Sequence, residues 1–207
     1  MSSRPVVVVL AAGRSSRYGA GRHKLEQPLG GTTVLGHTLR NVLASHLPLV
    51  VVTSEPLAPL ARGSVAARDL VVLDPQAPSG MGHSIAAGVA ARAQAGGWLV
   101  LPGDMPLVQP QTLQQVAAAL AHHPLAFAQY RGQRGHPVGF GTELFTELVM
   151  LDGDEGARRL VARYPAHAVE VDDPGVLVDV DTPDDLRSVT GGSRAVPTPF
   201  GAAGSPK

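Results

Sequence analysis

Basic residues crowd the segment that follows the first strongly apolar stretch of the chain. Val6 to Leu10 leads into Ala11-Ala12-Gly13, and Arg14, Arg17, Arg22 and Lys24 follow among further glycines. Small residues let a backbone approach a ligand closely, and the N–H groups of a glycine-containing turn can converge on an anion. So many cations in one short segment favour a strongly charged anion such as a phosphate chain. The ordinary alternative is a strand-to-loop connection with solvated arginines.

Two common phosphate-binding patterns are absent from this segment. The sequence has no G-x-x-x-x-G-K-[ST], so the segment is not a Walker A loop. Only Gly13 stands at the turn, so it is not the G-x-G-x-x-G of dinucleotide-binding proteins either.

Aspartates form a second group of candidate residues. Asp104 lies within Pro102-Gly-Asp-Met-Pro106, a rigid turn that presents its carboxylate. Asp179 and Asp181 follow the apolar run Val176 to Val180, and strand alternation predicts that both lie on one face. Carboxylates at two strand ends could hold Mg²⁺, which prefers one or two protein carboxylates together with substrate phosphates. Alternatively, Asp104 closes an Asx-turn and Asp181 caps a helix.

The first half of the chain alternates strand-like and helix-like stretches, which must position these residues. Strands are predicted at 6–11, 49–53, 70–73 and 98–101, because these runs are apolar without alternation. Helices are predicted at 33–46, at 85–95 with Ser84 as its cap, and at 111–122, with a weakly helical stretch at 56–68. This order predicts an α/β, Rossmann-like, three-layer fold with a mostly parallel sheet and helices on both faces. Ligands of such sheets bind at the carboxyl ends of the strands, where segments 12–24, 74–83 and 102–106 are expected.

The second half is less regular. Strands are predicted at 125–130 and 137–140, joined by a turn, and further short strands at 168–171 and 176–180. Helices are predicted at 143–150, at 157–163 and after Thr182-Pro183, with Thr182 or Asp181 as the cap. Residues 1–190 are expected to form one domain, and 191–207 a disordered tail without a hydrophobic core.

Composition excludes several classes of protein. The 207 residues include 17 basic and 17 acidic side chains, which argues against a broad nucleic-acid-binding face. Aromatic residues are only 4%, too few for a platform on which single-stranded nucleic acid stacks. No cysteine is present, so disulfides and cysteine-based metal sites are excluded. No membrane span or targeting segment is predicted, and a cytoplasmic location is expected.

Several of these motifs together resemble a known family. Leu10-Ala-Ala-Gly13 with Arg17 and Lys24 is similar to the signature loop of nucleotidyltransferases with a GT-A-like fold. Further matches to the molybdenum cofactor nucleotidyltransferases, the MobA/MocA-like group, are Leu101–Pro106, Gly135-His-Pro-Val138, Gly153–Arg158 and Asp179–Leu186. Gly80-Met-Gly-His-Ser84 resembles the cytidylyltransferase branch in particular. The resemblance covers roughly residues 5 to 190 and leaves out the tail.

The resemblance implies a role for each matching residue. Arg17, Lys24 and Asp104 would carry catalysis, with Arg17 and Lys24 on the triphosphate and Mg²⁺ on Asp104 and Asp179, or Asp181 in place of Asp179. The nucleotide would further contact Leu10, Ala11, Ala12, Gly13, Asp74, Gly80 and Ser84. A phosphate-bearing pterin acceptor would face His136, Pro137, Asp154 and Arg158. The implied reaction is in-line attack by an acceptor phosphate on the α-phosphorus of an NTP, with release of pyrophosphate.

The identities of the base and the acceptor stay open at this stage. Ala12, and the absence of Gln-Gly-Pro from segment 74–83, favour CTP over GTP, whereas Leu10 fits either branch. The acceptor is expected to be molybdopterin, with a molybdoenzyme as a candidate further partner. The alternatives are a sugar or polyol phosphate, or a non-catalytic protein that holds a nucleotide or cofactor for a molybdoenzyme. The intact set Arg17, Lys24, Asp104 and Asp179 argues against the non-catalytic alternative.

Overall fold

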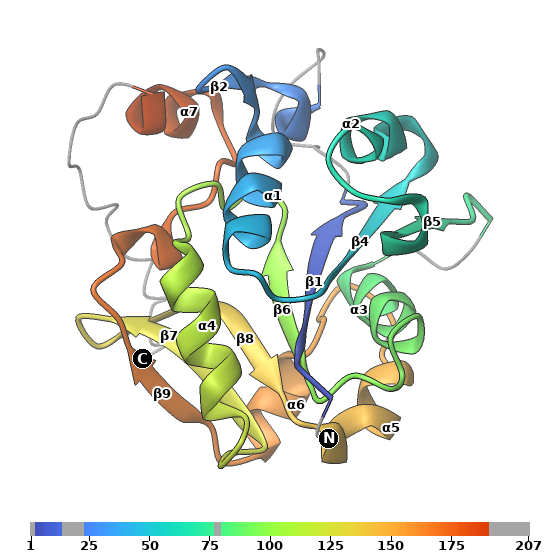
Figure 1. The fold of residues 1–207 in the computed structure, drawn as a ribbon, viewed down its shortest axis with the longest axis vertical. Helices are drawn as coiled ribbons and strands as arrows, with labels where there is room; N and C mark the ends of the chain where they lie inside the picture. The colour runs from blue at the N-terminus through green and yellow to red at the C-terminus, as the bar shows by residue number, and fades with distance from the viewer. Residues whose placement is uncertain (1–2, 14–22, 77–79, 191–207) are drawn as a thin grey trace, which may run out of the picture.

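A seven-stranded sheet with helices on both faces forms the molecule (Figure 1). The computed structural model describes residues 3–13, 23–76 and 80–190, so the predictions for Arg17 and for the tail lie outside the described residues. The sheet strands are β1 Val6–Ala11, β4 Leu49–Ser54, β5 Leu70–Leu73, β6 Trp98–Pro102, β7 Leu125–Tyr130, β8 Gln133–Phe140 and β9 His167–Glu170. A small separate hairpin consists of β2 Pro28–Leu29 and β3 Thr32–Thr33.

Six of the seven sheet strands run in the same direction. The strand order is β5-β4-β1-β6-β8-β7-β9, and only β8 is antiparallel to its neighbours β6 and β7. The predicted mostly parallel α/β sheet is therefore confirmed. Because β8 is reversed, it begins at the edge where the parallel strands end.

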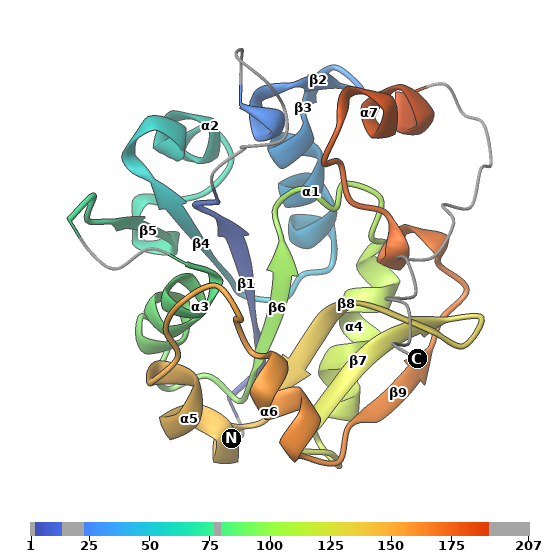
Figure 2. The same cartoon turned by 180° about the vertical axis from the view of Figure 1, so that it is seen from behind.

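Helices cover each face of this sheet, as the sequence predicted. On one face the residues of α1 Val34–Ala44, α2 Ala58–Arg62 and α4 Pro110–Ala119 share a hydrophobic cluster with Val7, Val9 and Ala11. On the other face α3 Met81–Ala90, α5 Phe145–Val149 and α6 Arg158–Arg163 share a cluster with Val6 and Val8, as the view from behind shows (Figure 2). The β1 side chains thus alternate between two hydrophobic cores, which explains why the strand is apolar at every position.

The remaining elements are short. They comprise the last helix, α7 Pro183–Thr190, and the 3₁₀ helices η1 Lys24–Glu26, η2 Glu55–Leu57, η3 Ala67–Asp69, η4 Thr142–Leu144 and η5 Pro174–Leu177. Within the described residues, no helix has the length and the apolar character needed to cross a membrane.

The predicted strand 176–180 is wrong. The chain forms η5 instead, because Pro174 fixes the first helical position and the Asp173 carboxylate accepts a hydrogen bond from Gly175 N at 2.9 Å. This local turn outweighs the β-branched residues that follow. Asp179 and Asp181 therefore do not lie on one face of a strand, although Asp181 contacts Lys24 and Asp179 interacts electrostatically with Asp104 and Asp181.

The helix predicted at 85–95 is shifted towards the N-terminus. Gly80 is the N-terminal cap residue of α3, which ends at Ala90, and residues 91–94 form turns. Ser84 therefore lies inside the helix, where its hydroxyl donates to Gly80 O at 3.2 Å, so the prediction of Ser84 as the cap is also wrong. The hairpin β2–β3 was not predicted, although its turn residues Gly30 and Gly31 both have the positive φ that favours glycine.

Candidate functional site

The ends of β1 and β6 lie side by side, which brings the two groups of candidate residues together. Leu10 pairs with Pro102 in the parallel register, and Gly103 N donates to Leu10 O at 2.8 Å. A side chain at Gly103 would collide with this carbonyl, since its Cβ would lie 2.9 Å from Leu10 O. Glycine thus allows the segment before Asp104 to pack directly on the end of β1.

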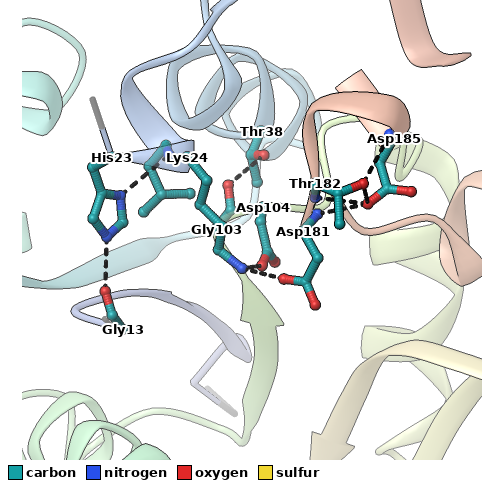
Figure 3. Close-up of polar contacts among 10 residues, drawn as sticks. Gly13, His23, Lys24, Thr38, Gly103, Asp104, Asp181, Thr182 and Asp185 are labelled. Atoms are coloured by element: carbon teal, nitrogen blue, oxygen red, sulfur yellow. Dashed lines mark hydrogen bonds and ion pairs between the residues drawn. The ribbon is translucent and has the colours of Figure 1, made fainter. Parts of the chain in front are cut away.

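Lys24 forms ion pairs with two aspartates at this edge (Figure 3). Its Nζ donates to Oδ2 of Asp104 and, at 2.5 Å, to Oδ1 of Asp181. The lysine side chain is only 17% exposed. Burial alone would lower the pKa of Lys24, but the two carboxylates outweigh it, so the pKa is raised and Lys24 is a fixed positive charge.

Backbone contacts hold these aspartates in place. Val180 N donates to Asp104 O at 2.9 Å, which joins the C-terminal segment to the end of β6. Thr38 of α1 donates its hydroxyl to Gly103 O at 2.9 Å. Next to Asp181, Thr182 accepts from Asp185 N while Oδ2 of Asp185 accepts from the backbone N–H of Asp181 and Thr182. This reciprocal capping at the start of α7 confirms Thr182, rather than Asp181, as the cap.

A third carboxylate, Asp179, lies close enough to interact electrostatically with the other two. Burial raises the pKa of Asp179, and the charges of Asp181 and Asp104 raise it further. Oδ1 of Asp104 is buried and has no hydrogen-bond partner among the described residues. Within those residues, no three or more His, Cys, Asp or Glu side chains are arranged as a complete metal-ligand set. Two carboxylates nevertheless suit Mg²⁺, which takes its other ligands from water and substrate phosphates.

His23 was missed by the sequence reasoning. Its Nδ1 accepts from Leu25 N at 3.2 Å, so the proton resides on Nε2, which lies 2.8 Å from Gly13 O and donates to it. The Glu26 carboxylate in turn accepts from His23 N at 2.9 Å. Figure 3 shows His23, the residue directly before Lys24, in contact with Gly13, which follows β1. The spacing of His23 and Glu26, which form a capping box, was the available signal.

The other predicted nucleotide-binding residues lie in three places. Leu10, Ala11, Ala12 and Gly13 form the end of β1 and the residues directly after it, beside Asp104. Gly80 and Ser84 lie at the start of α3. Asp74 lies apart from both groups, after the edge strand β5, and its exposed carboxylate accepts from Gln76 N at 2.8 Å. A solvated aspartate commonly forms such a hydrogen bond within a local turn. No contact among the described residues links Asp74 to Lys24 or Asp104.

The start of α3 interlocks with the segment before α6. Gly82 N donates to Gly153 O at 2.8 Å. A Cβ on Gly80 would lie 2.3 Å from Gly153 O, and one on Gly82 would lie 2.3 Å from Asp152 O. Gly80 also has a φ of +133°. These glycines are needed because another stretch of backbone occupies the space of a side chain. Segments predicted to bind the nucleotide and the acceptor are therefore neighbours.

A cavity of about 600 Å³ opens beside this interlock. Three of the four predicted acceptor residues, His136, Asp154 and Arg158, line it. Pro137 is buried and does not line the cavity, since alternate β8 residues face opposite sides of the sheet. An acceptor bound in this cavity would therefore not face Pro137.

His136 connects the cavity with the aspartate cluster. Burial lowers its pKa, as does the neighbouring charge of Arg134, whereas a hydrogen bond with the Val100 backbone and the charge of Asp104 act in the opposite direction. Nδ1 of His136 is buried and has no hydrogen-bond partner among the described residues. A neutral imidazole with an unused polar atom is thus available to a ligand.

Comparisons with known proteins agree on the family. The family model for the MobA-like NTP transferase domain matches residues 7–169. The purine catabolism protein PucB of Bacillus subtilis is 34% identical over 195 residues, which cover 88% of this chain and 94% of PucB.

Solved structures also share the fold. Rv0371c from Mycobacterium tuberculosis is 30% identical with a TM-score of 0.77, over 93% of this chain and 100% of that chain. A second structure of Rv0371c, a complex with manganese, is 31% identical with a TM-score of 0.73, over 92% of this chain and all of that one. Molybdopterin-guanine dinucleotide biosynthesis protein A from Archaeoglobus fulgidus is 20% identical with a TM-score of 0.69, over 90% and 97% of the two chains, and supports the fold alone.

Proposed function

This chain belongs to the family of MobA-like NTP transferase domains and is a nucleotidyltransferase, and we propose that it transfers CMP from CTP to the phosphate of a molybdopterin-type acceptor, releasing pyrophosphate. The observation that carries the proposal is the placement of Lys24 between Asp104 and Asp181 at the carboxyl ends of the parallel strands. Transfer of a nucleotidyl group needs positioned charges around the phosphates and little covalent work by the protein.

A divalent cation fits the aspartate cluster. Lys24 already contacts Oδ2 of Asp104 and Oδ1 of Asp181. The unpartnered Oδ1 of Asp104 and the nearby Asp179 therefore favour Asp104 and Asp179 as the residues that would hold Mg²⁺. When bound, such an ion acts as a Lewis acid and a template for phosphate oxygens. The manganese complex of Rv0371c, at 31% identity, supports a divalent cation in this family.

The protein's own groups would do the remaining work by binding and positioning. Lys24 and Arg17 would hold the triphosphate and stabilise the charge that builds on the leaving pyrophosphate. His136, Asp154 and Arg158 would orient the acceptor in the adjacent cavity. A phosphate oxygen is already ionised near neutral pH, so the attack on the α-phosphorus requires no general base. CTP is proposed as the donor because of Ala12 and because segment 74–83 lacks Gln-Gly-Pro.

The direct test measures pyrophosphate release from each of the four NTPs with Mg²⁺, in the presence and absence of molybdopterin. We expect release that requires both CTP and molybdopterin. Asp104→Asn should reduce the rate by about 10²–10³-fold or more, by analogy with the loss of other preorganised charge stabilisers. Retained secondary structure and thermal stability would show that the variant still folds.

Other outcomes of this assay would identify a different function. Release of pyrophosphate with a sugar or polyol phosphate, but not with molybdopterin, would mean that the protein is a nucleotidyltransferase with a different acceptor. Nucleotide binding without pyrophosphate release in any combination would favour the non-catalytic role. Near-normal turnover of Asp104→Asn with Mg²⁺ would contradict the assignment of Asp104. If Asp179→Asn kept its rate and Asp181→Asn were inactive, Asp181 rather than Asp179 would be the second metal ligand.

A further inference from the structure

One face of β8 forms a wall of the cavity. Arg134, His136, Val138 and Phe140 alternate along the strand and all line the cavity. On the opposite face, the Cα of Gly139 is packed so closely against α4 that an added Cβ would lie 3.2 Å from Val116 and Leu120. Because β8 runs antiparallel to β6, its first residues lie at the edge where β6 ends and Asp104 follows. The electrostatic effects of Arg134 and Asp104 on His136 agree with this placement.

Arg134 is held in position without an acidic partner. Its guanidinium carbon lies 4.4 Å from the centroid of the Phe127 ring, on the neighbouring strand β7. Stacking on an aromatic face orients the plane of a guanidinium and leaves its N–H groups free to donate to an anion. Among the described residues, no carboxylate lies within ion-pair distance of Arg134.

The charged side chains that line the cavity favour the binding of an anion. Arg158, at the start of α6, also lines the cavity and has no ion pair among the described residues. Two carboxylates line the cavity as well, those of Asp154 and Glu155. The Glu155 carboxylate is already paired with Arg159, at 2.6 Å. The two cavity arginines therefore exceed the unpaired acidic groups by one.

Apolar side chains supply most of the remaining wall. Met81 and Ile85 come from α3, Val138 and Phe140 from β8, and Val161 from α6. Such a surface binds the face of a ring better than it binds a polyol, whose hydroxyl groups would lose their hydrogen bonds with water. A bare inorganic anion would leave this surface uncovered.

We propose that Arg134 is a further acceptor-binding residue, and that with Arg158 it binds the phosphate of a phosphomonoester whose ring lies against the apolar wall. This inference rests on the proposed function and narrows its acceptor to a phosphomonoester that carries a flat ring, one face of which lies against the apolar wall. Arginine suits this role because its fork of donors matches the geometry of phosphate oxygens.

The test uses phenyl phosphate as the probe and methionine methyl groups as reporters. Met81 lines the cavity, Met105 is buried in the core and Met150 is exposed and does not line the cavity. With ¹³C-methyl methionine in the full chain, titration with phenyl phosphate should shift the Met81 signal and leave the Met105 and Met150 signals in place. Arg134→Gln and Arg158→Gln should each weaken this binding about 10–100-fold, the usual effect of losing a hydrogen bond to a charged group.

The same hairpin supplies a matched control. Arg131 also stacks on an aromatic ring, Tyr130, at 5.1 Å, but does not line the cavity. Arg131→Gln should therefore bind phenyl phosphate as the unaltered protein does. An unshifted Met105 signal in each variant would establish that its core is intact.

Three results would overturn the proposal. The first is that phenyl phosphate does not shift the Met81 signal of the unaltered protein. The second is that Arg134→Gln binds it with unchanged affinity, and the third is that Arg131→Gln loses as much affinity as Arg134→Gln. Failure of the proposed function would look different, because the probe would bind at Met81 with the expected dependence on Arg134 while no NTP released pyrophosphate.

Discussion

Lys24 neutralises much of the charge that three neighbouring aspartates create. It contacts Asp104 and Asp181 directly, while Asp179 is close enough that both carboxylates raise its pKa. Like charges at this spacing repel one another in a poorly solvated site. A buried cation between them is thus a structural requirement before any ligand arrives, and it is also the cation that the triphosphate would meet.

Replacing Lys24 should separate this residue from the other cations of the first segment. We expect Lys24→Gln to lower the rate of pyrophosphate release by about 10²–10³-fold, because a preorganised charge is lost from the site. Arg22→Gln, which alters a cation outside the described residues, is the control and should cause a much smaller loss. Steady-state rates of both variants decide the matter, and equal small effects would mean that Lys24 does not contact the phosphates.

Sequence patterns located Lys24 and Asp104 but could not reveal that they contact each other. These residues are 80 positions apart, and Lys24 and Asp181 are 157 positions apart. Strand ends are recognisable from apolar runs and turn residues, whereas a specific ion pair depends on side-chain positions in the folded chain. Arg134 left no signal at all, since a lone arginine beside a turn is usually solvated.

Asp173 shows why a β-branched run became a 3₁₀ helix and what that helix does. Its carboxylate is 2% exposed and accepts from Gln109 N at 2.8 Å, from the Thr112 hydroxyl at 2.7 Å and from Gly175 N. The first two donors belong to the start of α4, where Gln109 itself makes no side-chain cap. A distant aspartate thus caps α4, which no local pattern could reveal.

Removing this carboxylate should destabilise the protein. Asp173→Ala leaves buried donors of α4 and η5 without an acceptor, which should lower the free energy of unfolding by about 2–3 kcal/mol. The matched control is Asp172→Ala, which alters the exposed neighbouring residue and should have little effect. Urea unfolding of both variants provides the measurement. A loss below about 0.5 kcal/mol in Asp173→Ala would contradict the capping role.

Two imidazoles stack where the chain leaves α4 and where β9 begins. The rings of His123 and His167 lie 3.8 Å apart and are nearly parallel, at 2°. Burial lowers the pKa of His123 below its ordinary value of 6.5, and the neighbouring charges of His167 and His122 lower it further. The folded state therefore favours the neutral ring, whereas the unfolded state protonates it at higher pH.

This difference predicts a loss of stability in mild acid. The contribution of His123 is fully present above pH 6.5, falls as the pH drops below that value, and stops changing below the pKa of the folded state. We expect His123→Ala to flatten the decrease of the melting temperature between about pH 7 and pH 5. An equally steep decrease in the variant would show that other groups cause the pH dependence.

The arrangement of the whole sheet was largely predictable. Periodicity predicted the parallel first half, the two helical layers and the hairpin of β7 and β8, because each follows from local burial patterns. The insertion of β8 between β6 and β7 was not predictable in this way, since it depends on pairing between strands far apart in the sequence. That insertion determines which side chains form the cavity wall.

The contact between Gly82 and Gly153 has a consequence for hydrogen exchange. Because the Gly82 amide donates to a carbonyl before α6, it can exchange with solvent only when these two segments separate. A ligand that fills the cavity contacts both segments and should slow exchange at Gly82. Deuterium uptake of peptides covering residues 80–84 would measure this effect. One buried amide would thus report on cavity occupancy.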